Sequence, residues 1–197
     1  MIDYRRKTVI KGQQELRCGY TTGTCAAAAA KAAAVTLLSG EICRDVSLQL
    51  PGGEHIILET EFLECSENCV KCGMIKDAGD DPDITNGLLI CAAVEKTEGE
   101  TILIDGGMGV GRVTKPGLDQ PVGAAAINSV PRKMIHEAVE DVRRQYAWKK
   151  GLKVTVFIPN GKEKAEKTLN PMLGIVGGLS VIGTTGIVEP MSEKALI

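Results

Sequence analysis

The chain has 197 residues, of which 44% are hydrophobic and 24% are charged, and its formal net charge at pH 7 is −2. A chain of this length folds as one domain, or as one domain with a small part of another, and can bury a core. Aromatic residues make up 3% of the sequence and no apolar run is long enough to span a membrane. These features argue against base-stacking platforms for nucleic acid and against a membrane protein.

The N-terminal residues and the cysteines indicate the compartment. The N-terminal sequence MIDYRRK lacks the apolar core of a secretory signal peptide. Seven cysteines, an odd number, are more typical of reduced thiols than of a disulfide framework. We therefore expect a cytoplasmic protein with free thiols.

The most informative stretch, Arg17 to Leu38, reads RCGYTTGTCAAAAAKAAAVTLL. Its alanines predict a helix, with Thr22 or Thr24 as the capping residue. The start of a helix offers unpaired N–H groups and a positive dipole end, so Thr21, Thr22 and Thr24 beside glycines predict a site for phosphate or carboxylate. The alternative is an ordinary capped helix whose alanines pack on a sheet.

The middle of the chain predicts strands. Alternation from Val46 to Leu50, the turn Pro-Gly-Gly and a return from His55 to Phe62 predict a β-hairpin. The apolar run from Leu88 to Val94 predicts a strand covered on both faces, which we expect to form a second hairpin with Thr101 to Asp105.

An acidic loop separates these strands and contains Asp77, Asp80, Asp81 and Asp83. Four carboxylates this close repel one another unless cations, backbone donors or a ligand compensate, and Lys76 alone is insufficient. The loop begins like a calcium loop but lacks the required glycine and the final glutamate, so we do not interpret it as an EF-hand. Either these carboxylates position a cation or act as a base, or the segment is a solvated loop capped by its own aspartates.

A glycine-rich segment from Gly106 to Gly123 contains six glycines and two prolines, which predicts a long binding loop. Its start, DGGMGVG, resembles the first motif of S-adenosylmethionine methyltransferases, but Pro116 and Pro121 prevent the helix that should follow. We interpret it as a different loop, in which Lys115 is the natural partner of an acidic group.

The C-terminal part predicts a second, amphipathic helix, in which Pro131 occupies the first turn and an apolar stripe continues to Tyr146. Arg132 and Lys133 at its start are candidate carboxylate ligands, although surface helices carry such residues routinely. A strand follows from Leu152 to Ile158, and then a short helix from Lys162 to Lys167.

The sequence Thr184-Thr185-Gly186 repeats Thr21-Thr22-Gly23. One hypothesis is that both turns hold one anionic ligand; a chance match is the alternative. Ser192 is typical of the N-cap of a further helix, and a helix this close to the end is marginal, so we expect the natural protein to continue beyond Ile197.

The spacing of Cys65, Cys69 and Cys72 is that of radical S-adenosylmethionine iron–sulfur sites. The residue before the third cysteine is Lys71, where those sites prefer an aromatic residue, so we interpret the three as reduced, incidental thiols. His55 and His136 show no partner spacing, and we interpret both as structural.

These elements predict an α+β fold, with a mixed or antiparallel sheet packed by an Ala-rich helix and a second amphipathic helix, and with long Gly-rich loops. We expect residues 1–190 to form one α+β domain and residues 191–197 to begin a further helix or domain.

Five stretches occur in one order between Leu16 and Leu196. They read LRCGYTTGTCAAAAAKAA, KDAGDDPDITNG, GGMGVGRVTKPGLDQPVG, AINSVPRKMI and NPMLGIVGGLSVIGTTGIVEPMSEKAL. Together they resemble the CbiD family of cobalt-precorrin-5B (C-1)-methyltransferases, which act in anaerobic cobalamin biosynthesis. Ala125 and Ser129 stand where the family pattern leads us to expect proline, and the three clustered cysteines lie outside that pattern.

The resemblance implies transfer of a methyl group from S-adenosylmethionine to ring carbon C-1 of an anionic cobalt-containing tetrapyrrole. It implies Asp77 or Asp80 as the residue that orients a ligand or manages a proton. The implied substrate contacts are Thr21, Thr22, Thr24, Lys115 and Arg132. The candidate cofactor contacts are Gly107, Gly109, Gly178, Thr184 and Thr185; the alternative is that the adenosyl group lies mostly on the additional part of the longer family members.

No protein-bound metal is expected, because the cobalt belongs to the substrate, and a homo-oligomer is left open. Family members are considerably longer than this chain, and the additional part resembles an α/β domain. The alternatives are a non-catalytic tetrapyrrole-binding fragment and, from the cysteines, a metal-cluster protein.

Overall fold

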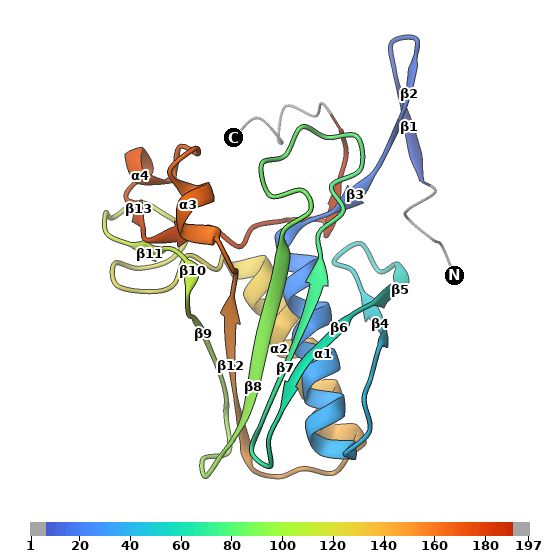
Figure 1. The fold of residues 1–197 in the computed structure, drawn as a ribbon, viewed down its shortest axis with the longest axis vertical. Coiled ribbons are helices and arrows are strands. Elements are labelled where there is room, and N and C mark those ends of the chain that lie inside the picture. Colours follow the sequence, from blue (N-terminus) through green and yellow to red (C-terminus); the bar gives the residue numbers. More distant parts are fainter. Residues whose placement is uncertain (1–6, 191–197) are drawn as a thin grey trace.

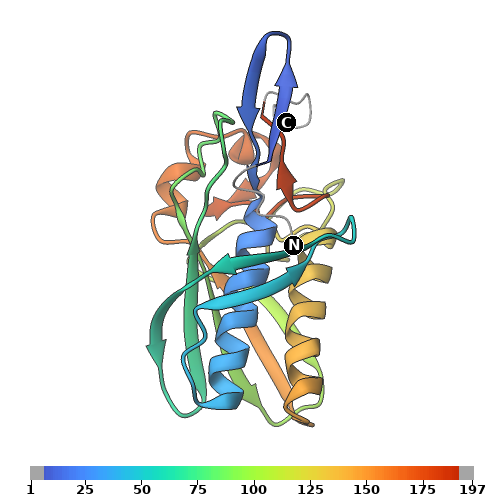
Figure 2. The same ribbon diagram turned by 90° about the vertical axis from the view of Figure 1, so that its right-hand side faces the viewer.

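The structure is a computed structural model that describes residues 7–190 (Figure 1). Two long helices, α1 (Thr22–Ser39) and α2 (Ser129–Gln145), pack against each other on one face of a five-stranded sheet. In spatial order its strands are β6 (Glu61–Cys65), β7 (Cys69–Ile75), β8 (Leu89–Thr97), β12 (Gly151–Phe157) and β9 (Ile102–Gly106). Figure 2 shows both helices on the same side of this sheet. The predicted α+β fold with a mixed sheet is confirmed.

Strand β12 lies between β8 and β9, antiparallel to β8 and parallel to β9. The predicted hairpin between residues 88–94 and 101–105 is therefore wrong. The inward-facing side chains of β12, Leu152, Val154 and Val156, are fully buried. Burial of this alternating row favours a central position for β12, because it removes more apolar surface from water than an edge position would.

Helix α1 is the centre of the core. Its alanines, Ala26 to Ala30 and Ala32 to Ala34, are all 0% exposed. Because an alanine side chain is short, the helix backbone can lie close to α2, to the sheet and to the strands beside it. The N-cap is Thr21, whose Oγ1 accepts from the amide of Thr24 at 3.2 Å, and not Thr22 or Thr24 as predicted. Gly40 ends the helix in the left-handed conformation at φ 80°.

Helix α2 has the predicted buried stripe, which includes Ile135, Val139 and Val142. The stripe does not reach Tyr146, which is 37% exposed and follows the last helical residue. A carboxylate from the preceding loop caps the start of α2. Asp119 Oδ1 accepts from the amide of Ser129 at 2.8 Å and from its Oγ at 2.7 Å.

The hairpin predicted from residues 46–50 and 55–62 is confirmed as β4 (Asp45–Gln49) and β5 (His55–Glu59), whose buried side chains join the core around α1. Residues 61–65 form the separate strand β6, which pairs with β7. A further hairpin, β1 (Thr8–Lys11) and β2 (Gln14–Arg17), projects from one end of the molecule (Figure 2).

The glycine-rich segments assemble above the sheet (Figure 1). Here β10 (Gly109–Val110) pairs in parallel with β14 (Gly178–Leu179), and β11 (Arg112–Val113) pairs with β13 (Ile175–Val176). The remaining elements are α3 (Gly161–Ala165), α4 (Asn170–Leu173), β3 (Gly19–Tyr20) and β15 (Ile187–Val188). The expected helix at Ser192 lies outside the described residues. Within residues 7–190, no helix has the length and apolar character needed to cross a membrane.

Candidate functional site

The start of α1 is covered by the chain that follows β14. The Oγ1 of Thr22 donates to the carbonyl oxygen of Ile182 at 3.1 Å and accepts from the amide of Ile182 at 2.9 Å. The amide of Gly23 donates to the same carbonyl at 3.0 Å. At this end of α1, therefore, a helix N–H group and a threonine hydroxyl are both bound by the protein's own main chain.

Gly186 binds the two neighbouring threonines. Its carbonyl oxygen accepts from Thr24 Oγ1 at 2.7 Å and from the amide of Thr21 at 3.2 Å. Thr21, Thr22 and Thr24 are 8%, 3% and 0% exposed. The hydroxyl groups of Thr22 and Thr24 are thus bound to main-chain carbonyls and Thr21 Oγ1 to the amide of Thr24, an arrangement that favours the alternative of an ordinary capped helix over the predicted anion site.

The two Thr-Thr-Gly sequences lie against each other. Besides the Gly186 contacts, a Cβ added to Gly183 would collide with the side chain of Thr21. Thr184 and Thr185 themselves are exposed. Direct packing between the two segments accounts for their proximity without a shared ligand.

Arg17 organises the N-terminal part of the acidic loop. Its Nη1 and Nη2 donate to the two carboxylate oxygens of Asp77 at 2.6 and 2.9 Å, and its amide donates to Asp80 Oδ2 at 2.6 Å. The hydrogen bond that Arg17 donates to Asp77 is the main cause of the raised pKa of Arg17. The two aspartates that were predicted to act on a ligand are thus neighbours, and both are held by one arginine.

Lys76 compensates the other end of the acidic loop. Its side chain is 1% exposed and its ammonium donates to Asp83 Oδ2 at 2.5 Å. Burial alone would raise the pKa of Asp83, but Lys76 and the hydrogen bonds from Thr85 together lower it. Sequence reasoning missed Arg17 as the second cation, although the repulsion among four carboxylates indicated that some compensation beyond Lys76 was needed.

The glycines proposed as cofactor contacts pack closely against other main chain. Gly109 and Gly178 are paired between β10 and β14, and a Cβ on Gly178 would collide with the carbonyl of Gly109. A Cβ on Gly107 would lie 3.0 Å from Thr155 Cγ2. Close packing therefore explains why positions 109 and 178 are glycine. Only the backbone groups of these two residues could contact a cofactor.

Lys115 lies at the surface beside α4. Its ammonium donates to the carbonyl of Met172 at 3.2 Å, and its side chain lies against Gly174. An ammonium has three donors, so this contact leaves donors for an acidic group.

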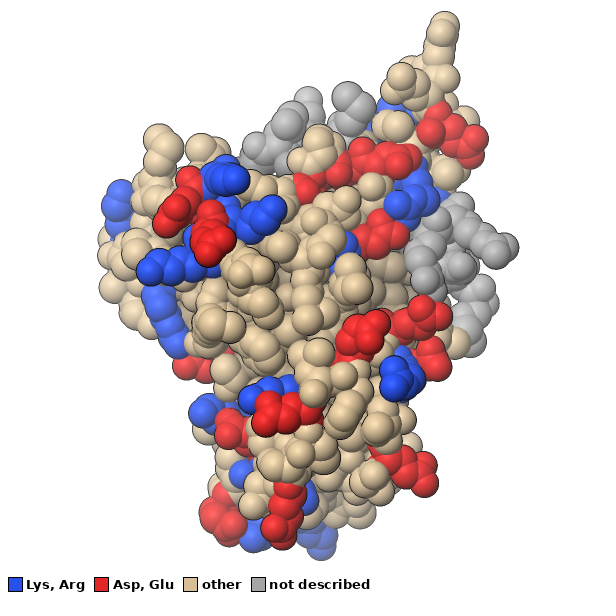
Figure 3. All heavy atoms as spheres, in the orientation of Figure 1, with Lys and Arg blue, Asp and Glu red and all other residues tan. Residues whose placement is uncertain are grey.

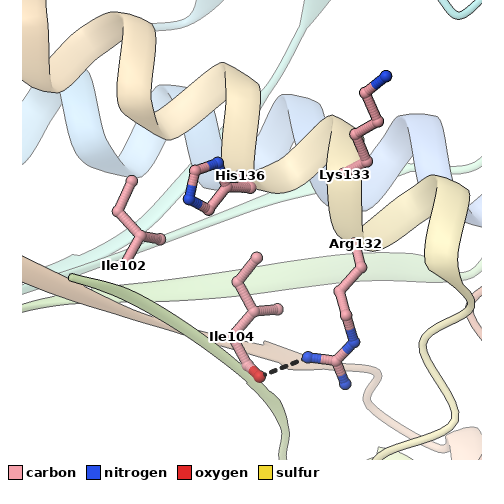
Figure 4. Close-up of a pocket in the computed structure, with 5 residues that line it drawn as sticks. All are labelled: Ile102, Ile104, Arg132, Lys133 and His136. Atoms are coloured by element: carbon pink, nitrogen blue, oxygen red, sulfur yellow. Dashed lines mark hydrogen bonds between the residues drawn. The ribbon is translucent and has the colours of Figure 1, made fainter. Parts of the chain in front are cut away.

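Arg132 lies in the first turn of α2 and borders a hollow of about 320 Å³ (Figure 4). Its Nη1 donates to the carbonyl of Ile104 at 2.7 Å and its Nε to the carbonyl of Ile127 at 3.3 Å. Ile102, Ile104, Lys133 and His136 line the same hollow.

The model of the CbiD protein family matches residues 9–190. The chain belongs to the CbiD family. Cobalt-precorrin-5B C(1)-methyltransferase of Ruminiclostridium cellulolyticum is 52% identical over 189 residues, covering 96% of this chain and 49% of that protein. The protein of the same name from Priestia megaterium is 51% identical, covering 96% of this chain and 52% of that protein.

A solved structure of a family member has the same fold. The crystal structure of the cobalamin biosynthesis protein CbiD from Archaeoglobus fulgidus matches with a TM-score of 0.73 and 33% identity, over 96% of this chain and 60% of that chain. The chain thus spans about half the length of the curated relatives it matches.

The cysteines at positions 65, 69 and 72 of this chain are not arranged around a common metal position. Successive side chains of a strand alternate between faces, so Cys69 and Cys72, three apart on β7, point to opposite faces of the sheet. Burial raises the pKa of Cys72 to about 12, which keeps this thiol protonated. In residues 7–190 no group of three or more His, Cys, Asp or Glu side chains is arranged to hold a metal ion.

The distribution of charge distinguishes parts of the surface. Figure 3 looks onto the face of the sheet opposite the helices; its middle carries few charges, whereas basic and acidic side chains gather over the α3 and α4 region and at the lower end.

His55 and His136, interpreted from sequence as structural, are both exposed. Of the two, His136 lines the hollow at Arg132.

Proposed function

We propose that this chain is part of an enzyme that transfers a methyl group from S-adenosylmethionine to ring carbon C-1 of cobalt-precorrin-5B, in anaerobic cobalamin biosynthesis. The family match over residues 9–190, together with about 50% identity to relatives of that name, carries this proposal. The substrate is an electron-rich macrocycle with several carboxylate side arms.

The chemistry requires alignment more than a reactive side chain. The macrocycle itself is the nucleophile, and S-adenosylmethionine, when bound, supplies the methyl group as a sulfonium. Alignment of two reactants contributes up to roughly 7–11 kcal/mol to a barrier reduction. The task of the protein is therefore to bind the acid arms, fix the ring and exclude water.

Lys115 and Arg132 are the proposed carboxylate contacts on this chain. Both side chains are cations with unused donors. Lys115 Nζ donates to the carbonyl of Met172 at 3.2 Å, and Arg132 Nη1 donates to the carbonyl of Ile104 at 2.7 Å. The threonines at the start of α1 take no part in this proposal, because they are buried and bound to main chain.

Asp77 and Asp80 are proposed to orient a ligand through the arginine that joins them. A carboxylate in a bidentate pair with Arg17 is poorly suited to accept a proton, whereas the pair as a unit is suited to position a polar group. Gly107, Thr184 and Thr185 are proposed cofactor contacts, since Thr184 and Thr185 are exposed and Gly107 is partly exposed.

The test is a turnover assay with cobalt-precorrin-5B and S-adenosylmethionine. It compares this chain alone with the chain joined to the C-terminal half of a curated relative. Methylation at C-1 by either protein supports the proposal; no methylation above background by the joined protein contradicts it.

The alternative is a non-catalytic tetrapyrrole-binding fragment. The observation behind this alternative is that the chain matches only about half the length of the relatives. Calorimetry on this chain alone distinguishes the two. Binding of the tetrapyrrole without S-adenosylmethionine would assign the cofactor contacts to the other half of the relatives, whereas binding of both would place them here.

A further inference from the structure

The guanidinium of Arg132 is partly buried without a direct anionic partner. Its two hydrogen bonds go to main-chain carbonyls, of Ile104 and Ile127, and no carboxylate in residues 7–190 lies within ion-pair distance of it. Burial lowers its pKa from the usual value. A guanidinium has five N–H donors, so three are left for a ligand.

The nearest carboxylates are engaged elsewhere. Asp105 forms a bidentate pair with Arg112, at 2.7 and 3.0 Å. Asp119 accepts from Ser129 and from Gln120 Nε2 at 2.6 Å. The charges of Asp105 and Asp119 thus act on Arg132 only from a distance, and its guanidinium has no carboxylate in direct contact among residues 7–190.

The surroundings of Arg132 combine apolar and basic groups. Figure 4 shows Ile102 and Ile104 of β9 facing the first turns of α2, with His136 beside Ile102 and Lys133 at the rim. The Lys133 ammonium is mostly exposed and lies 3.7 Å from Glu137 Oε1, so we expect it to contribute little to ligand binding. The hollow is largely open to solvent and has a volume of about 320 Å³, which suits a side arm lying at the surface and not a whole macrocycle.

We propose that this hollow is a carboxylate subsite, in which Arg132 binds the carboxylate of a short alkyl arm and Ile102 and Ile104 contact its methylene groups. The ligand class is an alkyl carboxylate. Its identity as an acid arm of the tetrapyrrole rests on the proposed function, whereas the carboxylate chemistry rests on the residues described above.

Arg132 also has a structural contact, so the variant that tests its charge has to keep a donor for that contact. By binding the carbonyl of Ile104, Arg132 also ties the edge strand β9 to α2. Arg132→Gln retains a donor for that carbonyl but loses the charge. Arg144→Gln is the matched control, since Arg144 lies on the same helix with a side chain that is 73% exposed.

The experiment uses methyl NMR of isoleucine-labelled protein with two probes, glutarate and its uncharged analogue glutaramide. We expect glutarate to shift the Ile102 and Ile104 methyl signals saturably, and glutaramide not to do so. Arg132→Gln should weaken glutarate binding by about tenfold or more, and Arg144→Gln should leave it unchanged.

Equal shifts from both probes, or wild-type affinity in Arg132→Gln, would overturn the subsite. The two-probe comparison needs no variant, so it decides the question even if Arg132→Gln folds poorly. Because glutarate binding is measured without turnover, a negative result here and a negative methylation assay remain separate findings.

Discussion

Thr24 and Gly186 lie 162 positions apart in the sequence and are joined by a hydrogen bond from Thr24 Oγ1 to the Gly186 carbonyl at 2.7 Å. Thr24 is fully buried, so this contact is shielded from water. Together with the Thr22 contacts to Ile182, it fixes the C-terminal segment of the described chain over the start of α1. The end of α1 that sequence predicts as a ligand site is a junction between two parts of the fold.

The first prediction concerns this junction. Thr24→Val retains the shape of the side chain but leaves the buried carbonyl of Gly186 without the hydroxyl donor. Because the Gly186 carbonyl still accepts from the amide of Thr21, we expect the free energy of unfolding in urea to fall by about 1 kcal/mol, the typical contribution of one hydrogen bond. Thr24→Ser, which retains the hydroxyl, should lose less. Equal stability of Thr24→Val and wild type would contradict the assigned hydrogen bond.

The second prediction concerns the paired glycines above the sheet. In Gly178→Ala the new Cβ would collide with the carbonyl of Gly109, which cannot rotate away as a side chain can. We expect a loss of about 3 kcal/mol in the free energy of unfolding, typical of severe overpacking. Gly99→Ala is the control, because no atom lies within 4 Å of its added Cβ. If both variants unfold at the same urea concentration, the close pairing of β10 with β14 is wrong.

Local sequence was sufficient for elements whose signals are continuous along the chain. The alanines of α1 and the apolar stripe of α2 predict helices because both propensity and periodicity lie within one segment. The hairpin of residues 45–59 was predictable for the same reason, since its turn and its alternation are adjacent.

Partners far apart in the sequence were not predictable in this way. Strand β12 enters the sheet between β8 and β9, and nothing local to Thr101–Asp105 specifies a parallel neighbour about 50 residues later. Likewise, Arg17 meets Asp77 across 60 positions. The same holds for the start of α1, where the Thr22 and Thr24 hydroxyls are bound by main-chain carbonyls about 160 positions later, which nothing local in the sequence specifies.

The third prediction concerns the buried lysine of the acidic loop. Lys76→Met removes the cation paired with Asp83 and leaves a largely buried carboxylate. We expect a loss of about 3 kcal/mol in the free energy of unfolding, the lower end for a broken buried pair. Lys71→Met is the control, since Lys71 and Glu64 form an exposed pair that should contribute little. A small effect at Lys76 would show that the loop is stabilised by other contacts.

The same carboxylate predicts a dependence of stability on pH. The folded pKa of Asp83 is lowered, so the unfolded chain takes up this proton at a higher pH than the folded protein does. The stabilisation is fully present above the unfolded pKa of about 3.9 and is lost as the pH falls through the folded value. We expect the difference between wild type and Asp83→Asn in urea unfolding to be constant from about pH 5 to 8 and to shrink below about pH 4. A difference unchanged at pH 3 would contradict this assignment.

The last prediction concerns the reactivity of the thiols. Burial raises the pKa of Cys72 and of Cys91 to about 12, and both side chains are 0% exposed, whereas Cys65 is exposed. Because the thiolate is the reactive form, iodoacetamide at pH 8 should label Cys65 in the folded protein and leave Cys72 and Cys91 unlabelled, as read by peptide mass spectrometry. Labelling in urea is the control, in which all three should react. Rapid labelling of Cys72 in the folded protein would mean that β7 opens locally, since neither a buried strand nor a protonated thiol permits that reaction.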